Sequence, residues 1–257
     1  MLNLLAPAAK RLSALCCMPS ACRLCGTWQS QSVCEGCVKG TTLSAPRCRR
    51  CGLQLKEDAI ESTCQSCEDH PPEMDSVVVG FDFAPPWSSM IGALKFRSDV
   101  ALARVLTAPL AQAIRQSDPT GRQMPDLIIP IPLSASRWQE RGYNQAWLLA
   151  HQLARECGWL NRLHHGTLIR RQETGRLMQM QRDQREARIR HAFAVQPEEI
   201  HRVQGQHVAL VDDVMTTGAT ANEAARVLLQ AGAASVTGWF AARTPAPKLG
   251  QRERAAQ

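Results

Sequence analysis

The chain has 257 residues, of which 44% are hydrophobic and 21% are charged, and this composition is typical of a globular protein and excludes a disordered chain. No apolar run approaches the ~18 residues that span a bilayer, and no secretory signal is evident, so we expect a cytoplasmic, thiol-reduced protein without a membrane span. The formal net charge is +7. It would fall to about +3 if two zinc ions were each held by four thiolates, so the basicity of the whole chain does not by itself indicate a nucleic-acid partner.

Cysteines dominate the first part of the chain. Ten of the eleven lie before residue 68, and eight of these form four consecutive Cys-x-x-Cys pairs. A two-residue spacer lets both sulfurs of a tight turn face one metal ion, and four thiolates complete a closed tetrahedral site, which predicts up to two structural zinc ions. Sequential pairing is the simplest, although the spacing also permits an interleaved one. The first site would comprise Cys22, Cys25, Cys34 and Cys37, and the second Cys48, Cys51, Cys64 and Cys67.

Other roles for this cysteine module remain as alternatives. A redox function for one pair is disfavoured because four pairs stand in regular order. The third pair is surrounded by Arg47, Arg49 and Arg50. These arginines would either contact nucleic-acid phosphates or form a solvated basic turn, and both interpretations stay open. The module has few large apolar residues, so metal binding should supply most of its folding free energy.

The composition changes near His70-Pro-Pro72, where we place the boundary between two domains. The predicted organisation is a lead segment over 1–18, a double zinc-ribbon module over 19–72, a second domain over 73–243 and a flexible tail over 244–257. Strands are expected over 77–83, 127–131, 192–195, 207–212 and 235–241. Helices are expected over 87–96, 100–116, 144–157 and 219–231. This alternation predicts an α/β domain with a parallel sheet between helices.

The most informative segment is Val208-Ala-Leu-Val-Asp-Asp-Val-Met-Thr-Thr-Gly-Ala-Thr220. An apolar strand is followed by Asp212 and Asp213, then by a loop of hydroxyls and glycine, then by a helix. A strand that enters a helix through a tight loop directs backbone N–H groups and the helix N-terminus at one point, which attracts phosphate. The two carboxylates would repel phosphate, but they suit the hydroxyls of a ribose. A plain strand–loop–helix with two exposed acids is the alternative.

This segment resembles the signature of the type I phosphoribosyltransferases. The resemblance implies that Asp212 and Asp213 hold the ribose of phosphoribosyl diphosphate. It also implies a 5′-phosphate cradle made of Thr216, Thr217, Gly218, Ala219 and Thr220. Leu127-Ile-Ile-Pro-Ile-Pro-Leu133 is similar to the first strand of that family, whose following loop binds diphosphate, and this places Pro132, Leu133 and Ser134 at the diphosphate.

The order of motifs along nearly the whole chain resembles the ComF/GntX family, in which a cysteine ribbon precedes a phosphoribosyltransferase-like domain. The string Arg141-Gly-Tyr-Asn-Gln145 and the segment Ala93-Leu-Lys-Phe-Arg97 carry this resemblance, together with the double Asp. Arg141 is the arginine that we expect in the diphosphate pocket. In the segment that begins at Thr174, Leu177, Met180 and Arg188 depart from the family pattern, which puts catalysis in doubt.

Two functions follow from these resemblances. The first is a phosphoribosyltransferase-like protein that binds phosphoribosyl diphosphate with Mg²⁺ and takes part in DNA uptake or utilisation during natural transformation. As an enzyme it would transfer the phosphoribosyl group to a nitrogen nucleophile. The alternative is a non-catalytic protein that handles single-stranded DNA, with DNA-uptake proteins as partners, and uses the pocket only to bind a phosphoribosyl or 5′-phosphate ligand.

Overall fold

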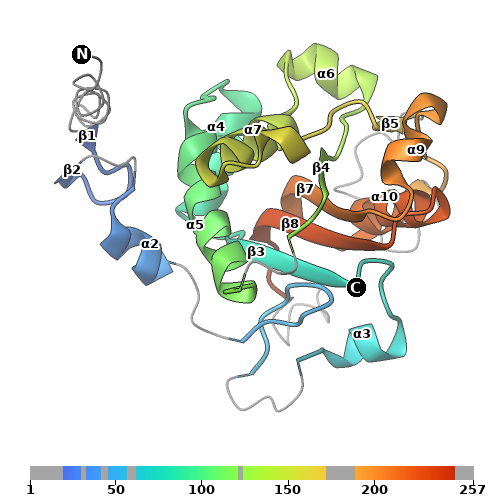
Figure 1. Ribbon diagram of the computed structural model, residues 1–257. Coiled ribbons are helices and arrows are strands. Elements are labelled where there is room, and N and C mark those ends of the chain that lie inside the picture. The colour runs from blue at the N-terminus through green and yellow to red at the C-terminus, as the bar shows by residue number, and fades with distance from the viewer. Residues whose placement is uncertain are drawn as a thin grey trace, which may run out of the picture. The chain divides into compact units, whose positions relative to one another are not determined.

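The computed structural model describes residues 20–29, 33–41, 46–56, 62–120, 124–171 and 189–246 (Figure 1). The segment of Leu177, Met180 and Arg188 and most of the tail lie outside these residues. The chain forms two compact units, 1–42 and 43–257. In the first, β1 (Ser20–Ala21) pairs antiparallel with β2 (Trp28–Gln29), and α2 (Glu35–Thr41) follows.

A four-stranded sheet organises the second unit. Its order is β3 (Ser76–Asp82), β8 (Ser235–Arg243), β7 (His207–Met215) and β4 (Leu127–Pro130). Every neighbouring pair is parallel, which confirms the predicted α/β class and parallel sheet. The central strand β7 is buried on both faces over most of its length because helices cover both sides.

Helices α5 (Leu102–Ser117) and α7 (Gln145–Cys157) cover one face of this sheet, and α10 (Ala219–Gln230) covers the other (Figure 1). Side chains of β7 alternate between these faces, and Val208 and Leu210 share a core with Leu228 of α10. The remaining described helices are α3 (Gln65–Asp69), α4 (Trp87–Phe96), α6 (Ala135–Arg141), η1 (Leu160–Arg162), η3 (Pro197–Glu199) and α9 (Ile200–Val203).

Two local predictions need correction. The strand expected over 192–195 does not join the parallel sheet: β6 (Phe193–Val195) pairs antiparallel with β5 (Leu168–Arg170) in a separate sheet. Helix α6 was not expected. It begins because the Ser134 hydroxyl accepts a hydrogen bond from the Arg137 N–H, and it ends at Gly142, whose φ of 74° is readily adopted by glycine.

The second cysteine cluster belongs to the same compact unit as the sheet. Cys48 is fully buried, and Cys51 lies in one core with Val77, Val79 and other residues of the sheet. A Cβ atom on Gly52 would lie 2.4 Å from Val79 Cγ2, so only glycine permits this close approach to β3. The two cysteine clusters therefore fall in different compact units, 1–42 and 43–257.

Within the described residues, no helix combines the length and the apolar character that crossing a membrane requires.

Candidate functional site

Two aspartates lie at the carboxyl end of β7. Asp213 is buried, and its Oδ2 lies 2.5 Å from Nζ of Lys95 on α4. Asp212 is partly exposed, and its Oδ1 accepts a hydrogen bond of 2.8 Å from the Asp213 N–H. The pair thus consists of one compensated buried carboxylate and one carboxylate that is open toward the following loop.

The two carboxyl groups differ in their pKa. Burial and the neighbouring charge of Asp213 raise the pKa of Asp212 well above its usual value. Burial also acts to raise the pKa of Asp213, but the charge and hydrogen bond of Lys95 outweigh it and lower that pKa. Asp213 is therefore held as an anion by Lys95, and Asp212 is the carboxyl that gains from a further cation or hydrogen-bond donor.

Residues Thr216–Gly218 connect β7 to the N-terminus of α10, and we call this segment the phosphate loop after its predicted role. Gly218 has φ of 88°, and a Cβ atom there would lie 2.8 Å from Met215 Cε, so the position requires glycine. Thr217 Oγ1 accepts the Ala219 N–H at 3.4 Å. A shallow hollow of about 40 Å³ opens at the loop. It is lined by Asp212, Val214, Met215, Thr216, Gly218, Thr220, Ala221 and Phe240.

The end of β4 lies beside this loop because β4 and β7 are parallel neighbours. The Ile131 N–H donates to the Val211 carbonyl at 2.9 Å, so Pro132, Leu133 and Ser134 leave the sheet at the same end as the aspartates. Ser134 is buried as the cap of α6, whereas the other two are partly exposed.

The segment 141–145 holds the surrounding helices together. Tyr143 donates its hydroxyl to the Leu94 carbonyl of α4. Asn144 is buried, donates to the Ile131 carbonyl at 3.0 Å and accepts the Ala146 N–H at 2.9 Å, which begins α7. These side chains fix the loop after β4 against α4 and α7.

Arg141 is partly buried at the end of α6. Its Nη1 donates to Gln145 Oε1 at 2.8 Å, and its guanidinium carbon lies 5.3 Å from the centre of the Phe96 ring. Its Nε is buried and has no hydrogen-bond partner in the described part of the chain. The positive charge of Arg141 also contributes to the lowered pKa of Asp213.

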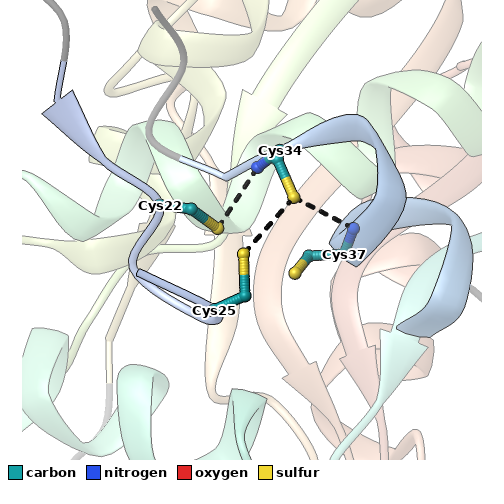
Figure 2. A group of neighbouring side chains, drawn as sticks. All are labelled: Cys22, Cys25, Cys34 and Cys37. Carbon is teal, nitrogen blue, oxygen red and sulfur yellow. Dashed lines mark hydrogen bonds between the residues drawn. The ribbon is translucent and has the colours of Figure 1, made fainter. Parts of the chain in front are cut away.

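The eight predicted ligands form two groups of four, each with all sulfurs within 4.8 Å of one another, and the pairing is sequential. Figure 2 shows the side chains of the first group converging on one point. The two groups repeat one geometry. The Cys34 N–H donates to Cys22 Sγ at 3.3 Å, and the Cys64 N–H donates to Cys48 Sγ at 3.3 Å.

This donor set fits a structural zinc ion. Burial acts to raise the pKa of the Cys22 thiol, but backbone N–H groups of Cys25, Cys34 and Leu24 lower it to about 6. These amides favour the thiolate that a metal ligand must be. Four sulfurs leave no position for a substrate, so both groups are compatible with structural zinc.

The structure also identifies residues that sequence reasoning did not assign. Lys95 lies inside the segment Ala93–Arg97 and had no predicted role, and Arg243 lies beyond the predicted strand 235–241, at the end of the predicted second domain, also without a role. Arg47 and Arg50 make contacts within the protein: Arg47 pairs with Asp82 at 2.9 Å, and Arg50 donates to the Met74 carbonyl at 3.3 Å. Buried partners such as these are not visible in a local sequence pattern.

No protein-family model matches the chain. The DNA utilization protein YhgH of Shigella flexneri is 36% identical over an alignment of length 239 that covers 88% of this chain and 98% of that protein. Competence protein F of Haemophilus influenzae is 33% identical over 82% of this chain and 90% of its own length. Competence protein ComFC of Bacillus subtilis is 27% identical, with 83% and 85% covered.

Among solved structures, a glutamine phosphoribosylpyrophosphate amidotransferase from B. subtilis aligns at 22% identity with a TM-score of 0.32. The alignment covers 51% of this chain and 25% of the length of that enzyme.

Proposed function

The chain belongs to the family of the DNA utilization protein YhgH and the competence proteins F and ComFC, and from this premise we propose that its sheet domain binds phosphoribosyl diphosphate. One observation carries the proposal: Asp212 lines the same hollow as Thr216, Gly218 and Thr220. One end of the sheet therefore carries a carboxylate that suits ribose hydroxyls. It also carries a loop whose N–H groups suit phosphate.

The charges around the hollow support a phosphorylated sugar as the ligand. Lys95 compensates Asp213, so the loop is not faced by two free carboxylates. Arg141 offers a buried Nε donor without a partner in the described residues, at the end of the helix that follows the proposed diphosphate segment Pro132–Ser134. Mg²⁺ bound to the diphosphate and the ribose hydroxyls would supply the remaining positive charge.

If the bound ligand reacts, the bond between ribose C1′ and the diphosphate oxygen breaks and a nitrogen nucleophile takes the phosphoribosyl group. Mg²⁺ would stabilise the departing diphosphate. Asp212 would hold the ribose while Asp213 stays paired with Lys95, and Arg141 would bind the departing anion. In the family context, the nucleotide chemistry would serve the use of DNA taken up by the cell.

The test is calorimetric titration of the zinc-loaded protein with phosphoribosyl diphosphate and Mg²⁺. We expect saturable binding that is lost in the double variant Asp212→Ala, Asp213→Ala. Absence of binding by the wild-type protein at millimolar ligand would refute the proposal. Release of diphosphate in a screen of nitrogen nucleophiles would then identify the reaction.

A second candidate function, the handling of single-stranded DNA, rests on exposed aromatic rings beside the site. Phe96 at the end of α4 is 65% exposed, and Trp138 on α6 is 54% exposed. Arg141 lies three residues after Trp138 and over the Phe96 ring. Stacking rings next to arginines suit the bases and phosphates of a single strand, and DNA-uptake proteins would be the partners in that role.

A further inference from the structure

Arg243 is a buried arginine that the proposed ligand chemistry does not use. It ends β8 and is 6% exposed. Its Nε donates to the Cys51 carbonyl at 2.8 Å, and its Nη1 donates to the Met215 carbonyl at 3.0 Å and to the Thr216 carbonyl. One guanidinium therefore joins a turn of the second cysteine cluster to the beginning of the phosphate loop.

The chemistry of arginine makes this connection difficult to replace. The guanidinium is planar and carries five N–H donors in a fixed arrangement, so it can bind carbonyl groups that come from different directions. The sheet register supports the same contact, because Arg243 lies opposite Met215 and the Thr244 N–H donates to the Met215 carbonyl at 3.0 Å. A shift of the Cys51 carbonyl would leave a buried donor unpaired, so the loop and the cluster must keep their relative positions.

The cluster and the loop also face each other across a cavity of about 150 Å³. Its lining includes Cys51, Cys64, Met215, Thr217 and Asn222. Asn222 belongs to the first turn of α10, and its Oδ1 is buried without a hydrogen-bond partner among the described residues. Arg243 lines this cavity as well, so the guanidinium and the cavity lie at one junction between the second cluster and the phosphate loop.

We infer that the second cysteine cluster supports the geometry of the ligand site. Arg243 is the positioning residue through which metal in this cluster holds the phosphate loop in place. Metal fixes the turn from Cys48 to Cys51 and so fixes the carbonyl that Arg243 binds. The guanidinium then holds the carbonyls of Met215 and Thr216, which orients the N–H groups that follow them. The inference rests on the proposed function for the identity of the ligand.

The first cluster provides an internal control, because it lies in the other compact unit and repeats the same geometry. Cys34 and Cys64 are equivalent positions, since each N–H donates to the first sulfur of its own group. Cys64→Ser should release metal from the second cluster, and Cys34→Ser should release it from the first. A general effect of metal loss would appear in both variants, whereas the proposed coupling appears only in Cys64→Ser.

The first measurement needs no ligand. Hydrogen exchange followed by mass spectrometry should show faster exchange over residues 215–220 in Cys64→Ser than in wild type. Cys34→Ser should match wild type over these residues, and both variants should match it over α5. Equal exchange at the loop in all three proteins would overturn the inference, whether or not phosphoribosyl diphosphate binds.

The second measurement is the affinity for phosphoribosyl diphosphate with Mg²⁺. We expect Cys64→Ser to weaken it about 10-fold and Cys34→Ser to leave it unchanged. Binding free energies couple reciprocally, so the ligand should tighten zinc binding in the second cluster by the same factor, as measured by competition with a chromophoric chelator. Unchanged affinity in Cys64→Ser would contradict the coupling.

Arg243→Lys tests the connecting residue itself. Lysine keeps the charge but has no planar group that can bind carbonyls of both the cluster and the loop. We expect both clusters to retain zinc, while the ligand no longer changes the zinc affinity of the second. If the reciprocal effect persists in Arg243→Lys, Arg243 is not the coupling residue. If wild type binds no phosphoribosyl diphosphate, the proposed function fails, and the exchange experiment still decides the inference.

Discussion

Lys95 and Asp213 form the ion pair on which the charge balance of the site depends. Their side chains come from α4 and β7, and the contact of 2.5 Å is largely shielded from water, with 21% and 4% of the two side chains exposed. Removal of one partner from a buried pair leaves an uncompensated charge, which is more destabilising than replacement of both. The same lysine therefore contributes to folding and to the charge of the ligand site.

Lys95→Met should lower stability at pH 7, since breaking a buried pair typically costs about 3–5 kcal/mol. Lys95 lowers the pKa of Asp213 below the ordinary value of 3.8. The stability that this ion pair contributes is therefore full above pH 3.8 and is lost as the pH falls through the lowered pKa. In the variant, burial raises the pKa of Asp213 and is opposed only by the smaller effects of Asp212 and Arg141. The stability difference from wild type should therefore shrink as pH falls from 7 to 4.

Denaturant unfolding between pH 4 and 8 measures this difference. Arg97→Met is the matched control, because Arg97 caps the same helix and is exposed. Its effect should be small at every pH. A difference for Lys95→Met that does not change with pH would show that Asp213 is not held as an anion by Lys95.

At the scale of elements, the phosphate loop depends on a left-handed glycine at the start of α10. Gly218→Ala should cost about 1–2 kcal/mol of stability because φ is positive there. Alanine disfavours this φ, so the loop should leave its geometry, and we expect affinity for phosphoribosyl diphosphate to fall about 10-fold or more. Calorimetry measures the binding, and thermal unfolding measures the stability.

Gly158→Ala separates the two effects. Gly158 ends α7 with φ of 76°, and its added Cβ would meet nothing within 4 Å. This control should lose similar stability and keep full ligand affinity. If both variants bind the ligand equally well, the phosphate loop does not need the geometry described here.

The exposed rings on α4 and α6 give a second prediction at this scale. Phe96→Ala and Trp138→Ala should each weaken binding of a short single-stranded oligonucleotide, because stacking contributes about 1–3 kcal/mol per base. Fluorescence anisotropy at several salt concentrations measures the affinity, which should fall with rising salt as phosphate contacts release counterions.

Leu160→Ala is the control for exposed apolar surface, since Leu160 is 48% exposed and lies on a different element, η1. Loss of affinity in all three variants would indicate nonspecific adhesion. Unchanged affinity in the two aromatic variants would remove the DNA-handling function from this surface.

At the scale of the whole molecule, the two cysteine clusters should differ in their effect on folding. We expect two zinc ions per chain by metal analysis, and one in either Cys22→Ser or Cys48→Ser. Cys48 is 0% exposed in the core that includes the sheet, so Cys48→Ser should lower the main unfolding temperature. Cys22→Ser should leave that transition in place, because Cys22 lies in the other unit.

Retention of two zinc ions in either variant would contradict the ligand groups. Equal unfolding temperatures for the two variants would show that the second cluster does not stabilise the sheet domain.

The sequence predicts those parts of the molecule whose physics is local. The strand, loop and helix around Asp212 and Gly218 follow from an apolar run, a hydroxyl-rich turn and a helical pattern that are contiguous in the chain. The sequential grouping of the cysteines was the simplest reading of their spacing. The predicted roles of the site residues stay predictions, although β7 and β4 bring their positions to one end of the sheet.

Contacts between distant segments could not be predicted in the same way. Arg243 binds the carbonyl of Cys51, 192 positions earlier, and nothing near either residue signals the contact. The antiparallel pairing of β6 was missed because a short apolar run does not specify its partner. The packing of the second cluster on the sheet was missed because ligand spacing describes the metal site and not its surroundings.

The position of the second cluster has a consequence for self-association. β3 is an edge strand, and its sequence, Ser-Val-Val-Val-Gly-Phe-Asp, is apolar and rich in residues that favour strands. The Val77 N–H, which points away from β8, donates to the Arg49 carbonyl at 2.8 Å, so the cysteine turn occupies a position that another chain could pair with. Loss of metal from this turn would expose the strand, and metal-depleted protein should accumulate as β-paired aggregates that added zinc prevents.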